Sequence, residues 1–161
     1  MPGKAKRTRK RGGGAGRAAA AQAVFQALPE KVFTSREPVI RRRLLLVEED
    51  RHNIDELRDV FTERGYECEV ALDLKTARNI LTERMMDLTV VNAGIPDIND
   101  EEIIREFRER DRSMSLVIYN GTKDKARQRK LRSMGAASYL STTSDLKAVA
   151  KSVVRVLTTR R

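Results

Sequence analysis

The chain has 161 residues, enough for one domain of ordinary size and a tail. Its formal net charge of +10 lies in residues 1–43, which hold twelve basic and two acidic residues, whereas residues 44–161 hold twenty-one of each. One cysteine excludes an intrachain disulfide framework, and neither a secretory segment nor an apolar run of the ~18 residues that span a bilayer is present, so we expect a cytoplasmic protein.

Residues 1–38 are expected to form a basic, Ala- and Gly-rich arm that is largely disordered. Residues 17–28 have the composition of a short helix, which Pro29 would end. The cations that could bind nucleic-acid phosphates are Lys4, Lys6, Arg7, Arg9, Lys10, Arg11 and Arg17. Two alternatives stay open for this arm: an organellar transit peptide, and a solvated tail without a specific partner.

From residue 43 onward, strand and helix patterns alternate five times. Short apolar or alternating runs predict strands at Arg43–Val47, Glu67–Ala71, Leu88–Asn92, Leu116–Asn120 and Ser138–Leu140. Amphipathic runs predict helices at Arg51–Arg64, after Asp73, after Asn99 or Asp100, at Lys123–Met134 and after Ser144. The residues that precede three of these helices have short polar side chains typical of N-caps.

Five such units with largely apolar strands imply a parallel sheet that helices cover on both faces. The expected α/β fold is a doubly wound, flavodoxin-like sheet with strand order 2-1-3-4-5. In that order the carboxyl ends of the strands meet at one cleft. The polar segments brought there are Glu48, Glu49, Asn92, Asn120-Gly121-Thr122 and Ser141-Thr142.

The order and spacing of three segments within residues 41–158 resemble a response-regulator receiver (CheY-like) domain. Leu44–Asn53 resembles its first strand with an acidic pair, Asp87–Pro96 its phosphoacceptor segment, and Gly135–Leu140 the entry to its fifth strand. The resemblance implies a receiver-like domain at residues 39–158. Because only three residues follow, we expect no C-terminal output domain.

The resemblance places Asn92 at the phosphoacceptor aspartate, and Glu48 and Glu49 at the metal-site positions. Asn120 and Gly121 then replace a hydroxyl residue and the small residue after it, and Thr142 replaces a lysine. Without a carboxylate at residue 92, the nucleophile and one Mg²⁺ ligand are missing. We therefore expect a degenerate receiver that is not an enzyme and holds no cofactor, with weak Mg²⁺ binding at Glu48 and Glu49 left open.

The segment Lys123–Arg132 carries six basic residues and one acid, above a thin apolar stripe of Ala126, Leu131 and Met134. The resemblance implies that this helix and the fifth strand form the output surface, with Tyr139 at an aromatic switch position. The expected surface residues are Tyr139, Lys123, Lys125, Arg129, Lys130 and Arg132. A solvated helix face is the plainer interpretation of the same charges.

The predicted function is a phosphorylation-independent receiver-like module that acts in signalling by protein–protein interaction. The alternative is a nucleic-acid-associated protein that binds through its basic arm. A receiver that autophosphorylates at another residue is a third hypothesis. Deletion of the arm would separate the first two, because it should abolish only nucleic-acid binding.

Overall fold

The computed structural model describes residues 41–96, 98–141 and 145–159. Its strands form one parallel sheet in the order β2-β1-β3-β4-β5, which confirms the predicted topology. The strands are β1 (Arg43–Val47), β2 (Glu67–Ala71), β3 (Leu88–Asn92), β4 (Ser115–Gly121) and β5 (Ser138–Ser141). The basic arm, the helix expected at residues 17–28, Thr142 and Ser144 lie outside the described residues.

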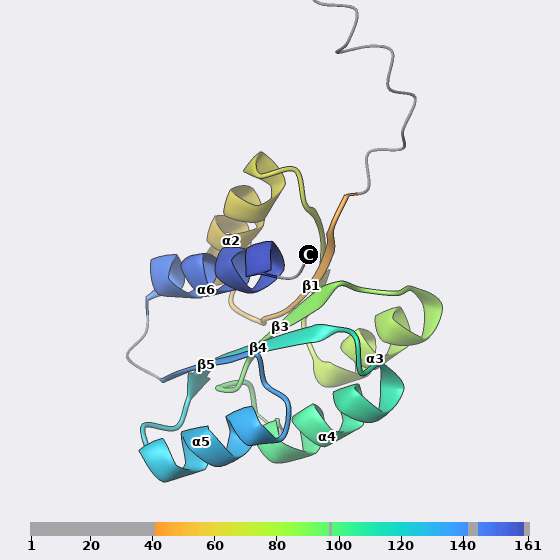
Figure 1. Cartoon of the computed structure of the whole chain (residues 1–161). Helices are drawn as coiled ribbons and strands as arrows, with labels where there is room; N and C mark the ends of the chain where they lie inside the picture. The colour runs from red at the N-terminus through yellow and green to blue at the C-terminus, as the bar shows by residue number, and fades with distance from the viewer. Residues whose placement is uncertain (1–40, 97, 142–144, 160–161) are drawn as a thin grey trace, which may run out of the picture. The chain divides into compact units, whose positions relative to one another are not determined.

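Helices cover both faces of the sheet (Figure 1). They are α2 (Arg51–Glu63), α3 (Leu74–Glu83), α4 (Asp100–Arg110), α5 (Lys125–Ser133) and α6 (Leu146–Thr159). Helices α2 and α6 lie on one face, and α3, α4 and α5 lie on the other. This arrangement follows from right-handed crossovers between parallel strands, and it leaves the carboxyl ends of the strands uncovered.

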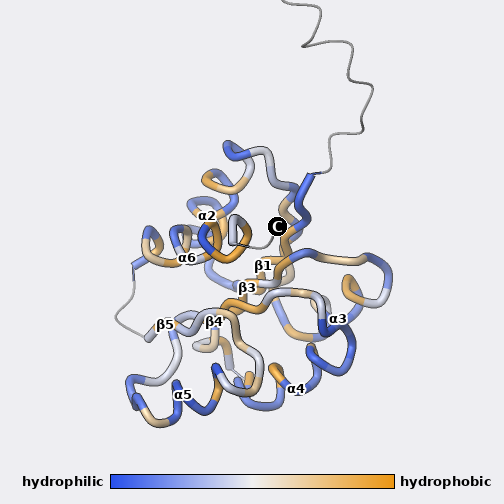
Figure 2. The backbone as a smooth tube through the Cα atoms, in the orientation of Figure 1, coloured by the Kyte–Doolittle hydropathy of each residue, from blue (hydrophilic) through white to orange (hydrophobic). Residues whose placement is uncertain are grey.

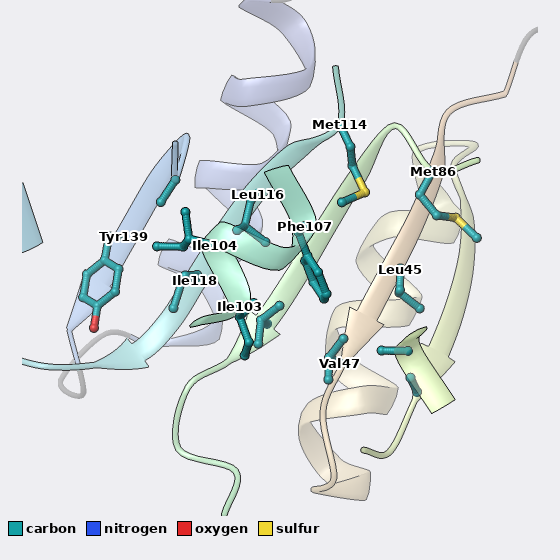
Figure 3. Packing of buried hydrophobic residues seen from close by; sticks show 14 of the residues in the cluster. Leu45, Val47, Met86, Ile103, Ile104, Phe107, Met114, Leu116, Ile118 and Tyr139 are labelled. Atoms are coloured by element: carbon teal, nitrogen blue, oxygen red, sulfur yellow. The ribbon is translucent and has the colours of Figure 1, made fainter. Parts of the chain in front are cut away.

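Alternation along β1 shows how the sheet divides the core into two layers. Leu45 and Val47 belong to the core layer beneath α3, α4 and α5, part of which Figure 3 shows, whereas Leu44 and Leu46 belong to the layer beneath α2 and α6. All four side chains are fully buried. Hydrophobic residues therefore concentrate in the central strands, while α5 is largely hydrophilic (Figure 2). The strands behave as buried parallel strands should.

Two predicted helix starts are wrong, for the same physical reason. Asp124 caps α5, because its side chain accepts a hydrogen bond from the Ala126 backbone nitrogen at 2.9 Å, so the helix begins at Lys125 rather than Lys123. Asp145 caps α6 and accepts from the Ala148 nitrogen at 2.7 Å, where Ser144 was expected. An aspartate at these positions accepts hydrogen bonds from the free N–H groups of the first turn, and its negative charge interacts favourably with the positive end of the helix dipole.

Candidate functional site at the carboxyl edge of the sheet

The side chain of Glu48 is the centre of the site, immediately after β1. It is completely buried, and its Oε1 accepts hydrogen bonds from the backbone nitrogens of Glu49 and Asp50 at 2.9 and 3.0 Å. Asn92 Nδ2 lies 3.0 and 2.9 Å from its two oxygens. The Tyr119 hydroxyl and Asn53 Nδ2, the latter at 3.4 Å, also donate to Oε2. Such donors stabilise a buried carboxylate without a cation.

The orientation of the Asn92 amide is fixed by what its oxygen accepts. Oδ1 accepts hydrogen bonds from the Gly94 backbone nitrogen at 2.8 Å and from Asn120 Nδ2 at 3.1 Å. The nitrogen of the same amide therefore points to Glu48, and every polar atom of this buried side chain has a partner. We call the set of Glu48, Asn92, Tyr119 and Asn120 the Glu48 network.

Asn120 reaches this network from an irregular strand end. Its backbone has φ +57°, and the pairing of β4 with β5 shifts register between Ile118 and Gly121. Asparagine tolerates this left-handed conformation better than most residues, and a bulge redirects the side chain of the bulged strand. A Cβ atom on Gly94 would lie 2.4 Å from Asn120 Nδ2, so a larger residue there would displace the Asn120 amide from the network.

Tyr119 belongs to the site, and the sequence analysis missed it. The residue is buried, and burial followed by the bond to Glu48 raises the pKa of its hydroxyl. One signal was available in the sequence: Tyr119 is the aromatic residue of the fourth strand, and a buried tyrosine hydroxyl usually finds a partner. Glu48, which follows β1 two places away from β4 in the sheet, was the candidate acceptor.

The donor set around Glu48 does not suit Mg²⁺, which receiver domains typically bind in an acidic pocket. Both Glu48 oxygens already accept several hydrogen bonds, and Asn92 presents an N–H group to them instead of an anionic oxygen. The Glu49 side chain is exposed at the surface. Within the described ranges, His, Cys, Asp and Glu side chains form no group of three that could hold a metal.

Tyr139 is part of the core, which corrects its expected place on the output surface. Its exposed fraction is 1%, and its ring lies among the buried residues shown in Figure 3. The hydroxyl accepts from the Thr122 nitrogen at 2.8 Å and donates to Asp100 Oδ2 at 2.9 Å. Burial raises the pKa of Tyr139 to about 12.

Asp100 extends this contact into a latch between three elements. Its second oxygen, Oδ1, accepts from the Arg127 guanidinium at 2.8 Å, so β5, α4 and α5 meet through Tyr139, Asp100 and Arg127. Gly121 makes the arrangement possible, because a Cβ atom there would lie 2.0 Å from the Tyr139 hydroxyl oxygen. The inward position of the ring is thus fixed by packing and by two hydrogen bonds.

The basic face of α5 is smaller than the sequence suggested. Lys130 pairs with Glu101 at 3.1 Å, and Arg132 donates to the Tyr139 carbonyl at 3.0 Å. Ala126 is exposed, so it is not part of an inner stripe, whereas Leu131 is buried as predicted. Lys123, Lys125 and Arg129, here called the α5 cations, are exposed and form no ion pair with the described residues.

A family model of the response regulator receiver domain matches residues 44–154. The chain belongs to this family. Receiver domains serve two-component signal transduction, and they are generally signalling modules rather than enzymes. None of the helices in the described part of this receiver is long and apolar enough to cross a membrane.

Curated relatives are longer regulators. The receiver is 29% identical over 104 residues to the photosynthetic apparatus regulatory protein RegA of Rhodobacter capsulatus, a match covering 65% of this chain and 56% of the relative. It is 26% identical over 99 residues to the transcriptional regulatory protein PhoP of Escherichia coli, covering 62% and 44%. The chain thus spans about half the length of these relatives.

Solved structures share the fold at low sequence identity. The receiver domain of the Francisella response regulator 1452 has a TM-score of 0.66 at 16% identity, with 75% of this chain and all of that chain (100%) covered. HP1043, an orphan response regulator of H. pylori, has a TM-score of 0.65 at 19% identity, with 74% and 99% covered. These matches agree with the five-stranded sheet described above.

Proposed function

We propose that this receiver domain is degenerate and signals without being phosphorylated, by binding a protein partner. The observation that carries the proposal is the hydrogen bond from the Asn92 amide nitrogen to Glu48. At the position that resembles the phosphoacceptor, a donor faces an acceptor, and both are buried.

The chemistry of phosphoryl transfer supports this proposal. A phosphoacceptor attacks phosphorus with a carboxylate oxygen and needs a cation to offset the charge on the phosphoryl oxygens. The amide oxygen of Asn92 is a weak nucleophile and already accepts two hydrogen bonds. Glu48 does not replace it, because its oxygens are buried and accept from five groups.

A receiver without phosphate has no chemical input at this edge to shift its conformation, since only an interaction that differs between two states can change their populations. The latch of Tyr139, Asp100 and Arg127 then holds one arrangement of β5, α4 and α5. The α5 cations flank that arrangement and present a constant positive surface. We propose that they meet an acidic protein partner, because complementary charge speeds encounter and selects the partner.

The first test asks whether the protein takes up phosphate. Purified protein is incubated with Mg²⁺ and acetyl phosphate, and its intact mass is recorded. We expect an unchanged mass, since no carboxylate occupies position 92. A receiver domain that has the phosphoacceptor aspartate is treated in parallel, and its gain of mass shows that acetyl phosphate is active. A stable adduct on any aspartate or glutamate of this protein would overturn the proposal.

The second test concerns the α5 cations. In the variant Lys123→Glu/Lys125→Glu/Arg129→Glu, the fold should persist because all three side chains are exposed, and capture of the specific partner should fall at least about tenfold. The matched control reverses Arg51, Arg58 and Arg64, three exposed cations near the other edge of the sheet, and changes the charge equally. Equal capture by the two variants would place the output surface elsewhere.

A second proposed function rests on one observation, the surplus of ten positive charges in residues 1–43. We propose that residues 1–17 bind nucleic acid, independently of the receiver domain. Deleting residues 1–38 should remove this binding and leave partner capture by α5 unchanged.

A further inference from the structure

A small hollow lies between α4 and the end of α5, two helices that pack side by side on one face of the sheet (Figure 1). Its volume is about 230 Å³. The lining consists of three arginines, one glutamate and one methionine: Arg105, Arg108, Arg112, Glu109 and Met134. We call this feature the arginine hollow. Because Arg112 precedes β4 and Met134 precedes β5, it lies at the sheet edge opposite to the Glu48 network.

Arg108 gives the hollow a positive charge that is held in place. The residue is half-buried, and its guanidinium donates hydrogen bonds to the Arg112 carbonyl oxygen at 3.1 Å and to the Met114 carbonyl oxygen. These bonds satisfy backbone acceptors just beyond α4, where a cation also interacts favourably with the helix dipole. The structural role of Arg108 thus fixes one cation at the hollow before any ligand arrives.

Arg105 and Arg112, the other two arginines of the hollow, have guanidinium groups that can turn to a ligand. Both side chains are exposed. Arg105 meets Glu101 at 3.8 Å, and Glu101 lies closer to Lys130, at 3.1 Å. Among the described residues, neither Arg112 nor Glu109 forms an ion pair. Because an exposed ion pair contributes little to stability, releasing Arg105 from Glu101 costs little free energy.

The charge and the size of the hollow match one class of ligand. Three arginines against one glutamate leave two positive charges. A phosphate monoester carries nearly two negative charges at neutral pH, and planar guanidinium groups bind its oxygens through paired hydrogen bonds. At ~30 Å³ for each water-sized group, the hollow has room for roughly eight such groups. That space suits a phosphoryl group on a short carbon chain, and Met134 offers the chain an apolar contact.

We propose that the arginine hollow binds a phosphate monoester without forming a covalent bond to it. The ester belongs to a small metabolite or to a phosphorylated side chain. Arg105 and Arg112 donate hydrogen bonds to the phosphoryl oxygens, and the fixed cation of Arg108 offsets the remaining charge. A phosphodiester fits less well, because it carries one negative charge where the hollow offers two positive ones. The proposal uses neither the Glu48 network nor the α5 cations, so it stands apart from the proposed receiver function.

The test follows methionine methyl signals by nuclear magnetic resonance in the full-length chain, with isotope-labelled methyl groups. Met134 lines the hollow, and the variant Met134→Leu assigns its signal. Inorganic phosphate, added at constant ionic strength, should shift the Met134 signal to saturation. The signal of Met86, which is buried elsewhere in the core, should stay in place. Dimethyl phosphate, a diester with one negative charge, should bind at least about tenfold more weakly.

Substitutions at the hollow test the role of each charge, and all of them keep the basic arm. Arg105→Gln/Arg112→Gln should weaken phosphate binding at least about tenfold, and Arg105→Lys/Arg112→Lys should recover only part of it, because lysine lacks the planar fork. Glu109→Gln should strengthen binding about threefold, since it removes a repelling carboxylate. The matched control Arg51→Gln/Arg58→Gln, on the exposed surface of α2, should bind as wild type does.

Two further titrations identify the source of the ester. Tighter binding of glycerol phosphate than of a phosphoserine tripeptide assigns the hollow to a small metabolite, and the reverse order assigns it to a phosphorylated protein. Unchanged Met86 and Met114 signals show that each variant is folded. A Met134 signal that phosphate does not move, an affinity that Arg105→Gln/Arg112→Gln retains, or equal affinity for dimethyl phosphate would each overturn the proposal.

Discussion

At the scale of single residues, the Asn92 amide stabilises the buried carboxylate of Glu48. The Asn92 amide nitrogen donates hydrogen bonds to both Glu48 carboxylate oxygens, at 3.0 and 2.9 Å. Replacing this donor by a carboxylate oxygen would convert an attraction between buried groups into a repulsion between like charges. The stability of the buried Glu48 carboxylate therefore depends on the amide nitrogen of Asn92. The same side chain has no carboxylate oxygen that could act as a nucleophile.

Asn92→Asp should accordingly destabilise the protein by about 3 kcal/mol at neutral pH, because it leaves two adjacent buried carboxylates. Excess Mg²⁺ should stabilise the variant more than wild type, because a cation offsets the repulsion between the two carboxylates. Urea unfolding midpoints measure both effects. Asn79→Asp makes the same chemical change on the exposed surface of α3 and should be neutral. Equal stability of Asn92→Asp and wild type would contradict this account.

The sequence could predict only part of this site. The positions of Glu48, Asn92 and Asn120 at one sheet edge follow from the strand order, which was predicted correctly. The contact of Tyr119 with Glu48 was not predicted, because it depends on which way one aromatic side chain turns at a strand end. The left-handed conformation of Asn120 also escaped prediction, since a bulge depends on pairing between two strands.

At the scale of elements, the end of β4 and the ring on β5 fit each other. Gly121 lies against Tyr139, and a Cβ atom there would be 2.0 Å from the hydroxyl oxygen and 2.3 Å from Cζ. The tyrosine can occupy its inward position only because residue 121 has no side chain. The inward position of the Tyr139 ring thus depends on Gly121, a residue with no side chain.

Gly121→Ala should therefore cost about 2 kcal/mol through overpacking and should alter the near-ultraviolet dichroism of the tyrosines. The same substitution made in a Tyr139→Ala background should cost much less, since the obstructing ring is gone. In a Tyr139→Phe background the cost should remain, because Cζ and Cε1 stay in place. A double-mutant cycle from urea unfolding tests this, and additive costs in the alanine background would refute the proposed contact.

The helices show where the hydrophobic pattern of the sequence was sufficient to predict burial and where it was not. Ile54, Leu57 and Phe61 recur in the sequence at the spacing of one helix face, and the structure buries all three in α2. The pattern failed in α5, where Ala126 was expected inside but is exposed, since a helix with so few apolar residues has little periodic signal. The starts of α5 and α6 differ from the prediction by one or two residues, because Asp124 and Asp145 cap these helices.

At the scale of the whole molecule, a neutral domain carries a strong internal charge separation. Residues 48–69 hold nine acidic and three basic residues, counting only Asp, Glu, Lys and Arg, whereas residues 123–155 hold nine basic and two acidic residues. The first group surrounds the β2 edge of the sheet and the second surrounds the β5 edge. Total charge alone conceals this asymmetry, on which the proposed partner contact of the α5 cations depends.

The basic arm adds a third, separable charge, and its prediction concerns the full chain. Residues 1–17 contain seven cations, so if all contact duplex phosphates, log K against log salt should have a slope of about −6 as an upper bound. Sequence preference should be slight, because phosphate contacts carry no base information. Electrophoretic shifts at graded salt measure the slope. Deleting residues 1–38 should abolish binding, while reversal of the α5 cations should leave the slope unchanged. Tight binding that survives the deletion would show that the receiver domain, rather than the arm, contacts the nucleic acid.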